Sequence, residues 1–184
     1  MIDREHALEL LREYVKGEGL VKHCLGAEAA MRTYALRYGG DPEIWGLAGL
    51  LHDFDWEIHP NAEEHPKAGE PILRAAGVPE EVIYTILAHA DYLNLERKSW
   101  MDKTLPAVDE LSGFIIAVTL VRPSKKIADV DVSSVKKKMK DKAFARAVKR
   151  EDITAGAELL GVPLDEHIGF VLDAMKASAP ELGL

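Results

Sequence analysis

Apolar side chains recur every three to four residues along almost the whole chain, which is the periodicity of an amphipathic helix. The clearest example is segment 20–38, in which a stripe of apolar positions ends at Gly39 and Gly40. No stretch keeps the strict alternation of apolar and polar residues that a half-buried strand requires. The pattern therefore predicts an all-α protein, a single-domain bundle of about seven to nine helices.

Capping residues and prolines divide this pattern into elements. Asp3 and the pair Asp41-Pro42 are typical helix starts, because an aspartate caps free backbone N–H groups and proline suits the first helical turn. Pro66 and Pro79 begin two further helices for the same reason. The predicted helices are 3–16, 20–38, 42–53, 66–77, 79–90, 105–120, 133–148, 152–160 and 163–177, with a loop at 54–65 and a partly helical segment at 91–103.

The length and composition support one compact domain. A chain of 184 residues can bury one substantial core and is short for two domains. The single cysteine, Cys24, excludes an intrachain disulfide and suits a reducing compartment, and we expect it to be a small buried hydrophobe. The first residues carry no secretory signal, and the longest apolar run, 114–118, is too short to span a bilayer. We therefore expect a cytoplasmic protein without a membrane partner.

Charge is distributed unevenly along the chain. The net charge is −8, yet segment 121–150 contains eleven basic and three acidic residues. An acidic protein is a poor candidate for general nucleic-acid binding, since that affinity follows the neutralisation of phosphates. The basic segment is better matched to a small phosphorylated ligand, although most of its lysines have the distribution of a solvated helix face.

The chemistry of the chain centres on His52 and Asp53, which end an apolar helix. His23 lies upstream and Asp109 downstream, each in a helix with a predicted buried face. Neighbouring side chains diverge by about 100° inside a helix. Two adjacent ligands can nevertheless flank one metal at a helix terminus, or serve two metals with the carboxylate as a bridge. A buried aspartate is costly unless it is paired or coordinated, so these residues are candidate metal ligands.

The spacing of His23, the dipeptide His52-Asp53 and Asp109 resembles the HD superfamily of metal-dependent phosphohydrolases. The stretches 108–113 and 121–126 also look like a subgroup of small stand-alone HD proteins. The resemblance implies one HD domain over residues 1–184, with a metal-site core at about 20–122 and C-terminal helices at about 131–177 packed on it. It also implies that His52 and Asp53 are catalytic.

Two further histidines match the ligands of a second ion in the two-metal enzymes of this superfamily. His65 and His89 have the expected order between the dipeptide and Asp109. The chain departs from the pattern in the short stretch before His65 and in Ala90, where the cyclic-dinucleotide phosphodiesterases of the superfamily carry another histidine. The expected cofactors are therefore one or two divalent transition-metal ions, namely Fe, Mn, Zn or Ni, which suit imidazole and carboxylate ligands.

The expected activity is hydrolysis of a nucleotide or another small phosphate ester by a metal-activated hydroxide. Arg122, Lys125 and Lys126 follow the Asp109 helix, and they are candidates for binding a substrate phosphate if Pro123 turns the chain back. Two alternatives stay open at this stage, a diiron oxygenase of the HD type and a non-catalytic metal-containing ligand sensor.

Several other polar residues are candidates for supporting roles. The sequence leaves open whether Asp55, Glu57 and Glu110 orient the metal-binding histidines through hydrogen bonds or are solvated acids. The histidines without support as ligands are expected at the surface or around the ligands: His6, His59 and His167.

Overall fold

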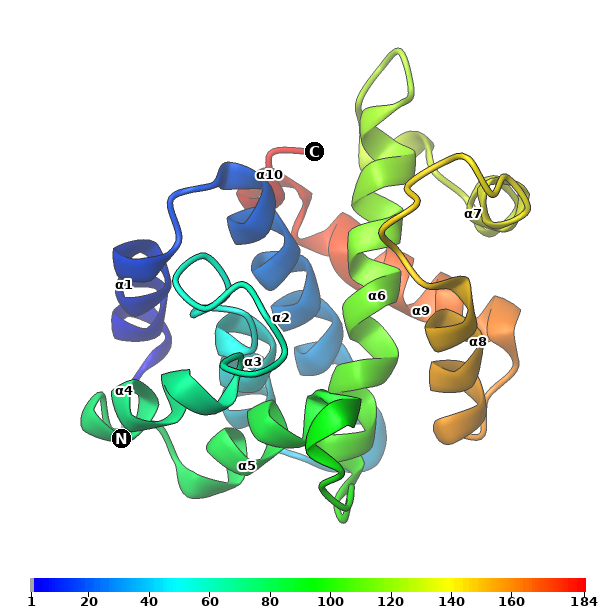
Figure 1. Cartoon of the computed structure of the whole chain (residues 1–184). Coiled ribbons are helices and arrows are strands. Elements are labelled where there is room, and N and C mark those ends of the chain that lie inside the picture. The colour runs from blue at the N-terminus through cyan, green and yellow to red at the C-terminus, as the bar shows by residue number, and fades with distance from the viewer. Residues whose placement is uncertain (1) are drawn as a thin grey trace.

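The computed structural model describes residues 2–184, and in this range it contains ten α-helices, three short 3₁₀ helices and no strand (Figure 1). The all-α prediction is therefore confirmed. The α-helices are α1 (Arg4–Tyr14), α2 (Glu18–Tyr38), α3 (Pro42–Leu51), α4 (Glu70–Ala75), α5 (Glu80–His89), α6 (Trp100–Leu120), α7 (Val132–Met139), α8 (Arg150–Leu159), α9 (Leu164–Ala177) and α10 (Ala179–Leu182). The 3₁₀ helices are η1 (Lys67–Gly69), η2 (Asp91–Leu93) and η3 (Ile127–Asp129).

The capping chemistry at the N-terminal helices matches the sequence. The side chain of Asp3 accepts a hydrogen bond from the backbone of His6, and that of Asp41 accepts one from Glu43. Gly39 ends α2 in the left-handed conformation, at φ +72°, which a residue without a Cβ adopts at little cost. The boundaries of the first three helices thus follow from local sequence.

Helices α2 and α6 form the centre of the molecule. In Figure 1, α1 and α3–α5 lie to one side of these two helices and α7–α9 to the other. Helix α2 packs on α3, α6 and α9, whereas α6 packs on α2, α5 and α8. The largest fully buried side chains come mainly from these central helices and their neighbours, among them Tyr34, Phe54, Leu105, Leu111 and Phe114.

Helices α2 and α3 approach closely at Gly49. A Cβ built there would lie 2.7 Å from backbone atoms of Ala27 and Glu28 in α2. Glycine costs a helix roughly 1 kcal/mol relative to alanine. Here it allows the backbones of two helices to meet just before the His52-Asp53 dipeptide.

Some predicted boundaries are wrong. Helix α6 begins at Trp100, five residues before the predicted start, because Ser99 and Asp102 form a reciprocal capping box and Pro106 is accommodated inside the helix. The helix predicted from 66 begins as 3₁₀, and its α-helical part starts at Glu70. The helix predicted at 133–148 ends at Met139.

The early end of α7 has a visible cause. The guanidinium of Arg150 donates hydrogen bonds to the backbone carbonyls of Asp141, Phe144, Ala145 and Val148. These carbonyls accept hydrogen bonds from the guanidinium instead of from the backbone N–H groups of a continuing helix. Segment 140–149 is therefore a series of turns that leads back to α8. Within residues 2–184, none of the helices combines the length and apolar character needed to cross a bilayer.

Candidate metal centre

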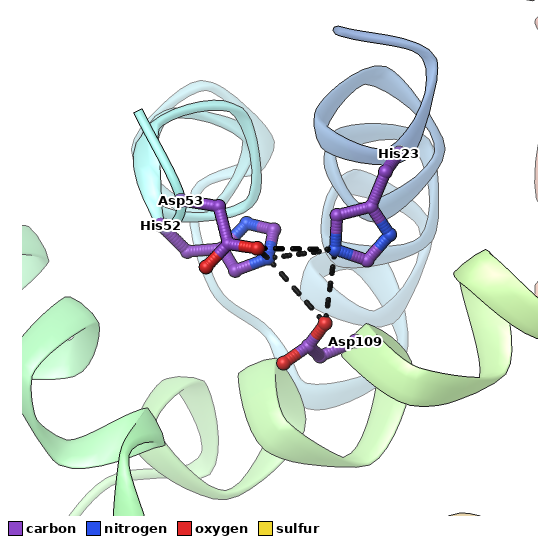
Figure 2. Close-up of side chains that lie close together, drawn as sticks. All are labelled: His23, His52, Asp53 and Asp109. Carbon is purple, nitrogen blue, oxygen red and sulfur yellow. Dashed lines mark hydrogen bonds and ion pairs between the residues drawn. The ribbon is translucent and has the colours of Figure 1, made fainter. Parts of the chain in front are cut away.

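Four side chains from three segments of the chain converge at the junction of α2, α3 and α6 (Figure 2). His23 lies on α2, His52 and Asp53 follow α3, and Asp109 lies on α6. The Nε2 atom of His23 is 3.0 Å from Nε2 of His52 and 3.0 Å from Oδ1 of Asp109. Oδ2 of Asp53 is 3.5 Å from Nε2 of His52 and 3.6 Å from that of His23.

These separations fit a common cation. At a metal–ligand distance of about 2.1 Å, neighbouring ligand atoms lie about 3.0 Å apart in octahedral coordination and about 3.4 Å apart in tetrahedral coordination. The measured contacts among the four side chains span 3.0 to 3.6 Å. The donor set of imidazole nitrogen and carboxylate oxygen suits a divalent transition metal.

A second group of donors lies on the other side of Asp53. Its Oδ1 atom is 3.3 Å from Nε2 of His65 and 3.8 Å from Nε2 of His89. Oδ2 of the same carboxylate faces His23 and His52. Asp53 thus presents one oxygen to each group, which is the arrangement of a bridging ligand.

The position of the dipeptide explains how two adjacent residues reach one site. His52 is the C-terminal cap of α3, and Asp53 lies in the turn that follows. The α-helix ends at Leu51, so both side chains lie at its C-terminal end, from which they can flank a shared site.

Hydrogen bonds hold three of the imidazoles with Nε2 toward the cluster. Nδ1 of His52 donates to the backbone carbonyl of Gly49 at 2.8 Å, and Nδ1 of His89 donates to that of Ile86. Nδ1 of His65 lies 2.7 Å from Oδ1 of the fully buried Asp55. A proton on Nδ1 leaves the lone pair of Nε2 free, as a metal ligand requires.

The acidic residues near the site have different roles. Asp55 contacts His65 and leaves its second oxygen without a hydrogen-bond partner among the described residues. Glu57 instead accepts hydrogen bonds from the backbone N–H groups of Lys16 and Gly17, so it supports the start of α2. Glu110 lies in the pocket, where burial and the charge of Asp109 raise its pKa to about 7.

Charges within the cluster shift the pKa values of its side chains. Burial lowers the pKa of His52, but the carboxylates of Asp53 and Asp109 outweigh this effect and raise the pKa to about 9. Burial likewise opposes protonation of His65, whereas Asp53 and Asp55 raise its pKa to about 9. Burial raises the pKa of Asp53 and Asp109, but neighbouring imidazoles hold both pKa values below the ordinary range. The two carboxylates therefore attract positive charge, which protons or a cation can supply.

A cavity of about 670 Å³ opens onto these ligands. One side is formed by residues near α5 and η2, including Trp56, Tyr92 and Arg97, and the other by α6 and α8, including Lys149 and Asp152. This volume is within the usual range for small-molecule sites.

The expected phosphate-binding residues lie elsewhere. Arg122 donates a hydrogen bond to Ser134 near the start of α7, and Lys125 and Lys126 line a separate surface cavity with Lys176. Asp109 is followed by about three turns of helix before these residues, so about 17 Å of α6 separates them from the centre. The chain does turn after Pro123, but it turns toward α7 and α9.

The sequence interpretation missed other pocket residues. Trp56 and Tyr92 were not singled out, although aromatic residues in loops beside the histidines are a usable signal. Arg97 carries no comparable signal, and Lys149 belongs to the basic segment 121–150. The expectation that His167 lies at the surface or near the ligands is wrong: it is fully buried, bonded to the Tyr34 hydroxyl and to the backbone carbonyl of Ala107.

A comparison with protein families identifies the family to which a chain with this cluster belongs. The model of the HD domain matches residues 20–157, which is most of the chain and includes every candidate ligand. The chain belongs to the HD domain family. This family is the metal-dependent phosphohydrolase superfamily and its domains bind divalent metals, in agreement with the cluster.

The curated relatives of this HD domain protein are much longer. Ribonuclease Y of Cutibacterium acnes is 32% identical over 99 residues, which is 53% of this chain and 18% of the relative. Ribonuclease Y of Desulfotalea psychrophila is 31% identical over 98 residues, with the same shares of the two chains. The match thus spans less than a fifth of each relative. No solved structure matches.

Proposed function

We propose that this HD domain protein is a phosphohydrolase that holds one ion among His23, His52, Asp53 and Asp109, and a second among Asp53, His65 and His89. Divalent ions at these positions would lower the pKa of a water molecule and neutralise charge on a phosphoryl group. The proposed substrate is a nucleotide or another small phosphate ester.

The observation that carries this proposal is the orientation of Asp53. Its two oxygens face two different sets of donors, at 3.5 to 3.6 Å on one side and 3.3 to 3.8 Å on the other. A carboxylate that served only as the partner of one histidine would not need a second set of imidazole nitrogens facing its other oxygen. Catalytic metal sites also keep open positions, and here the pocket opens directly onto His23, His65, His89 and both aspartates.

The residues of the site have different roles in this proposal. His52 is fully buried and does not line the cavity, so its role is to hold the centre rather than to contact a substrate. Asp109 and Asp53 supply negative charge that keeps cations in place. Lys149 is the cation of the pocket with the most exposed side chain, at 73%, and it is available to a phosphate oxygen.

The relatives widen the substrate class. Both carry the name Ribonuclease Y, which indicates RNA as their substrate. A phosphodiester of a short oligoribonucleotide therefore belongs beside nucleoside monophosphates among the esters to be tested.

The test combines metal analysis with a substrate panel. The purified protein is stripped with chelator and titrated with Mn²⁺, Zn²⁺ or Fe²⁺, and bound metal is measured. The loaded protein is then assayed on phosphomonoesters, cyclic and linear dinucleotides and a short RNA, with and without oxygen. Stoichiometric metal and oxygen-independent release of phosphate or nucleotide support the proposal.

A matched pair of variants sharpens this test. His23→Ala should lose metal and hydrolysis together, whereas His6→Ala should keep both, because His6 is an exposed histidine bonded to Asp3 outside the cluster. Metal-loaded wild type that leaves every phosphate ester intact would refute the phosphohydrolase. A product that forms only with oxygen would instead support the oxygenase alternative.

A further inference from the structure

Two aromatic side chains line the pocket beside the second group of ligands. Trp56 and Tyr92 both border the cavity, and 41% and 45% of their surface remains exposed. Large aromatic side chains contribute much of the apolar burial in a protein, and Tyr and Trp are enriched at interfaces. Here the exposed surface borders a cavity, so a ligand inside that cavity can cover it.

Both side chains are held in place through His65. The backbone N–H of Trp56 donates to the carbonyl of Asp53 at 3.0 Å, in the turn that also carries the metal-site dipeptide. The Trp56 indole meets the ring of His65 edge to face, with centroids 4.9 Å apart and an interplanar angle of 90°. The hydroxyl of Tyr92 donates to the backbone carbonyl of His65 at 2.7 Å. Each ring is thus positioned relative to the candidate ligands before any substrate enters.

The remaining charges of the pocket disfavour a second phosphate. The guanidinium of Arg97 is committed to the carbonyls of Ala88 and His89 and to the carboxylate of Asp91. Lys149 has a carboxylate 3.9 Å away in Asp152. Apart from the candidate ligands, the lining contains three acidic residues and two basic ones. Beside the candidate ligands, the rest of the pocket is therefore better matched to an uncharged planar group than to further phosphates.

We propose that Trp56, assisted by Tyr92, is a specificity-determining residue that stacks on the planar base of a substrate whose phosphoryl group lies at the metal centre. The inference rests on the proposed function and extends it: the site prefers an ester with a nucleobase and a single phosphate over sugar phosphates and nucleoside triphosphates. Stacking is sequence-tolerant because every base has a π-face, so the preference is for a base in general.

The experiment measures binding rather than turnover. Methylene phosphonate analogues of adenosine monophosphate, adenosine triphosphate and ribose 5-phosphate resist hydrolysis at the reacting bond, and each is titrated calorimetrically into Mn²⁺-loaded protein. Wild type should bind the adenosine monophosphate analogue most tightly. Trp56→Leu should weaken this binding by about 5- to 150-fold, the range for one base–aromatic stack, and leave the ribose analogue unchanged.

Two further variants separate stacking from general disturbance. Trp100→Leu removes an indole of similar exposure, 45%, which stacks on Tyr38 outside the pocket lining, and it should change neither affinity. Tyr92→Phe loses the hydrogen bond to His65 but retains the ring, so it should keep the preference for a base better than Tyr92→Leu does.

The outcomes are decisive in both directions. Equal affinity of wild type for the adenosine monophosphate and ribose analogues overturns the inference, as does an equal loss of both in Trp56→Leu or tighter binding of the triphosphate analogue. If sugar phosphates and nucleotides are hydrolysed alike, the proposed function stands and the inference fails. If base-dependent binding is found but no ester is hydrolysed, the base site stands and the proposed hydrolysis fails.

Discussion

Protons and metal ions should compete for the same imidazoles, and this competition predicts an unusual pH dependence of stability. In chelator-treated protein, Asp53, Asp55 and Asp109 raise the pKa of His52 and His65 from 6.5 to about 9. A folded-state pKa above the unfolded value stabilises the fold below the unfolded pKa, and this contribution is lost as the pH rises through the folded pKa. The metal-free protein should therefore lose stability between pH 6.5 and pH 9.

The shift of His52 alone, which is fully buried, sets the minimum size of the loss. A rise of about 2.5 pKa units corresponds to about 3 kcal/mol. The lowered pKa values of Asp53 and Asp109 express the same attraction, so they are not added to it. For a chain of this length, about 3 kcal/mol corresponds to a change of roughly 6–12 °C in Tm.

The assay is urea unfolding of chelator-treated protein, followed by circular dichroism at pH 6.5, 7.5, 8.5 and 9. Asp109→Asn removes one carboxylate that holds a proton on His52, so its free energy of unfolding should vary less across this range. Mn²⁺ or Zn²⁺ should reverse the trend, because binding displaces those protons and metal affinity rises with pH. Constant or rising stability of the metal-free wild type from pH 6.5 to 9 would refute the reasoning.

Further predictions address single positions. Asp53→Ala should remove both metal and hydrolysis, and stoichiometric metal in this variant would contradict its place in both groups. His89→Ala should bind one equivalent of metal where wild type binds two, with depressed turnover; one equivalent in both would favour a mononuclear site. Asp55→Asn should weaken binding of the second ion by about 10- to 100-fold in a metal titration, since Asp55 orients His65. Gly49→Ala should destabilise the fold by about 1–3 kcal/mol in urea unfolding, because the added methyl group meets the backbone of α2; unchanged stability would show that the helices can separate freely.

The sequence predicted the first three helices well, and it singled out the four side chains that the fold brings together, because both depend on local features. Asp3, Asp41 and Gly39 cap helices through contacts within a few residues. The dipeptide at the end of α3 is recognisable because a buried carboxylate next to a histidine has few structural explanations.

Long-range contacts account for the predictions that failed. Periodicity continues past Met139, but Arg150 takes the carbonyls that a longer α7 would have used. Local sequence could not place Arg122 either, because the direction of the chain after α6 depends on packing against α7 and α9. His167 was misplaced for a similar reason, since its partners are Tyr34 and Ala107, both distant in the sequence.

The turns held by Arg150 have a consequence for how this protein can diversify. One wall of the pocket, with Val148 and Lys149, is supported in part by the guanidinium of Arg150, which binds main-chain carbonyls rather than particular side chains. Such a support accepts many residue types at the exposed positions 142, 143, 146, 147 and 149, whereas Phe144, Ala145 and Val148 pack against the core. Libraries confined to these five exposed positions should therefore yield altered substrate choice with the metal centre intact, which makes them a suitable starting point for directed evolution.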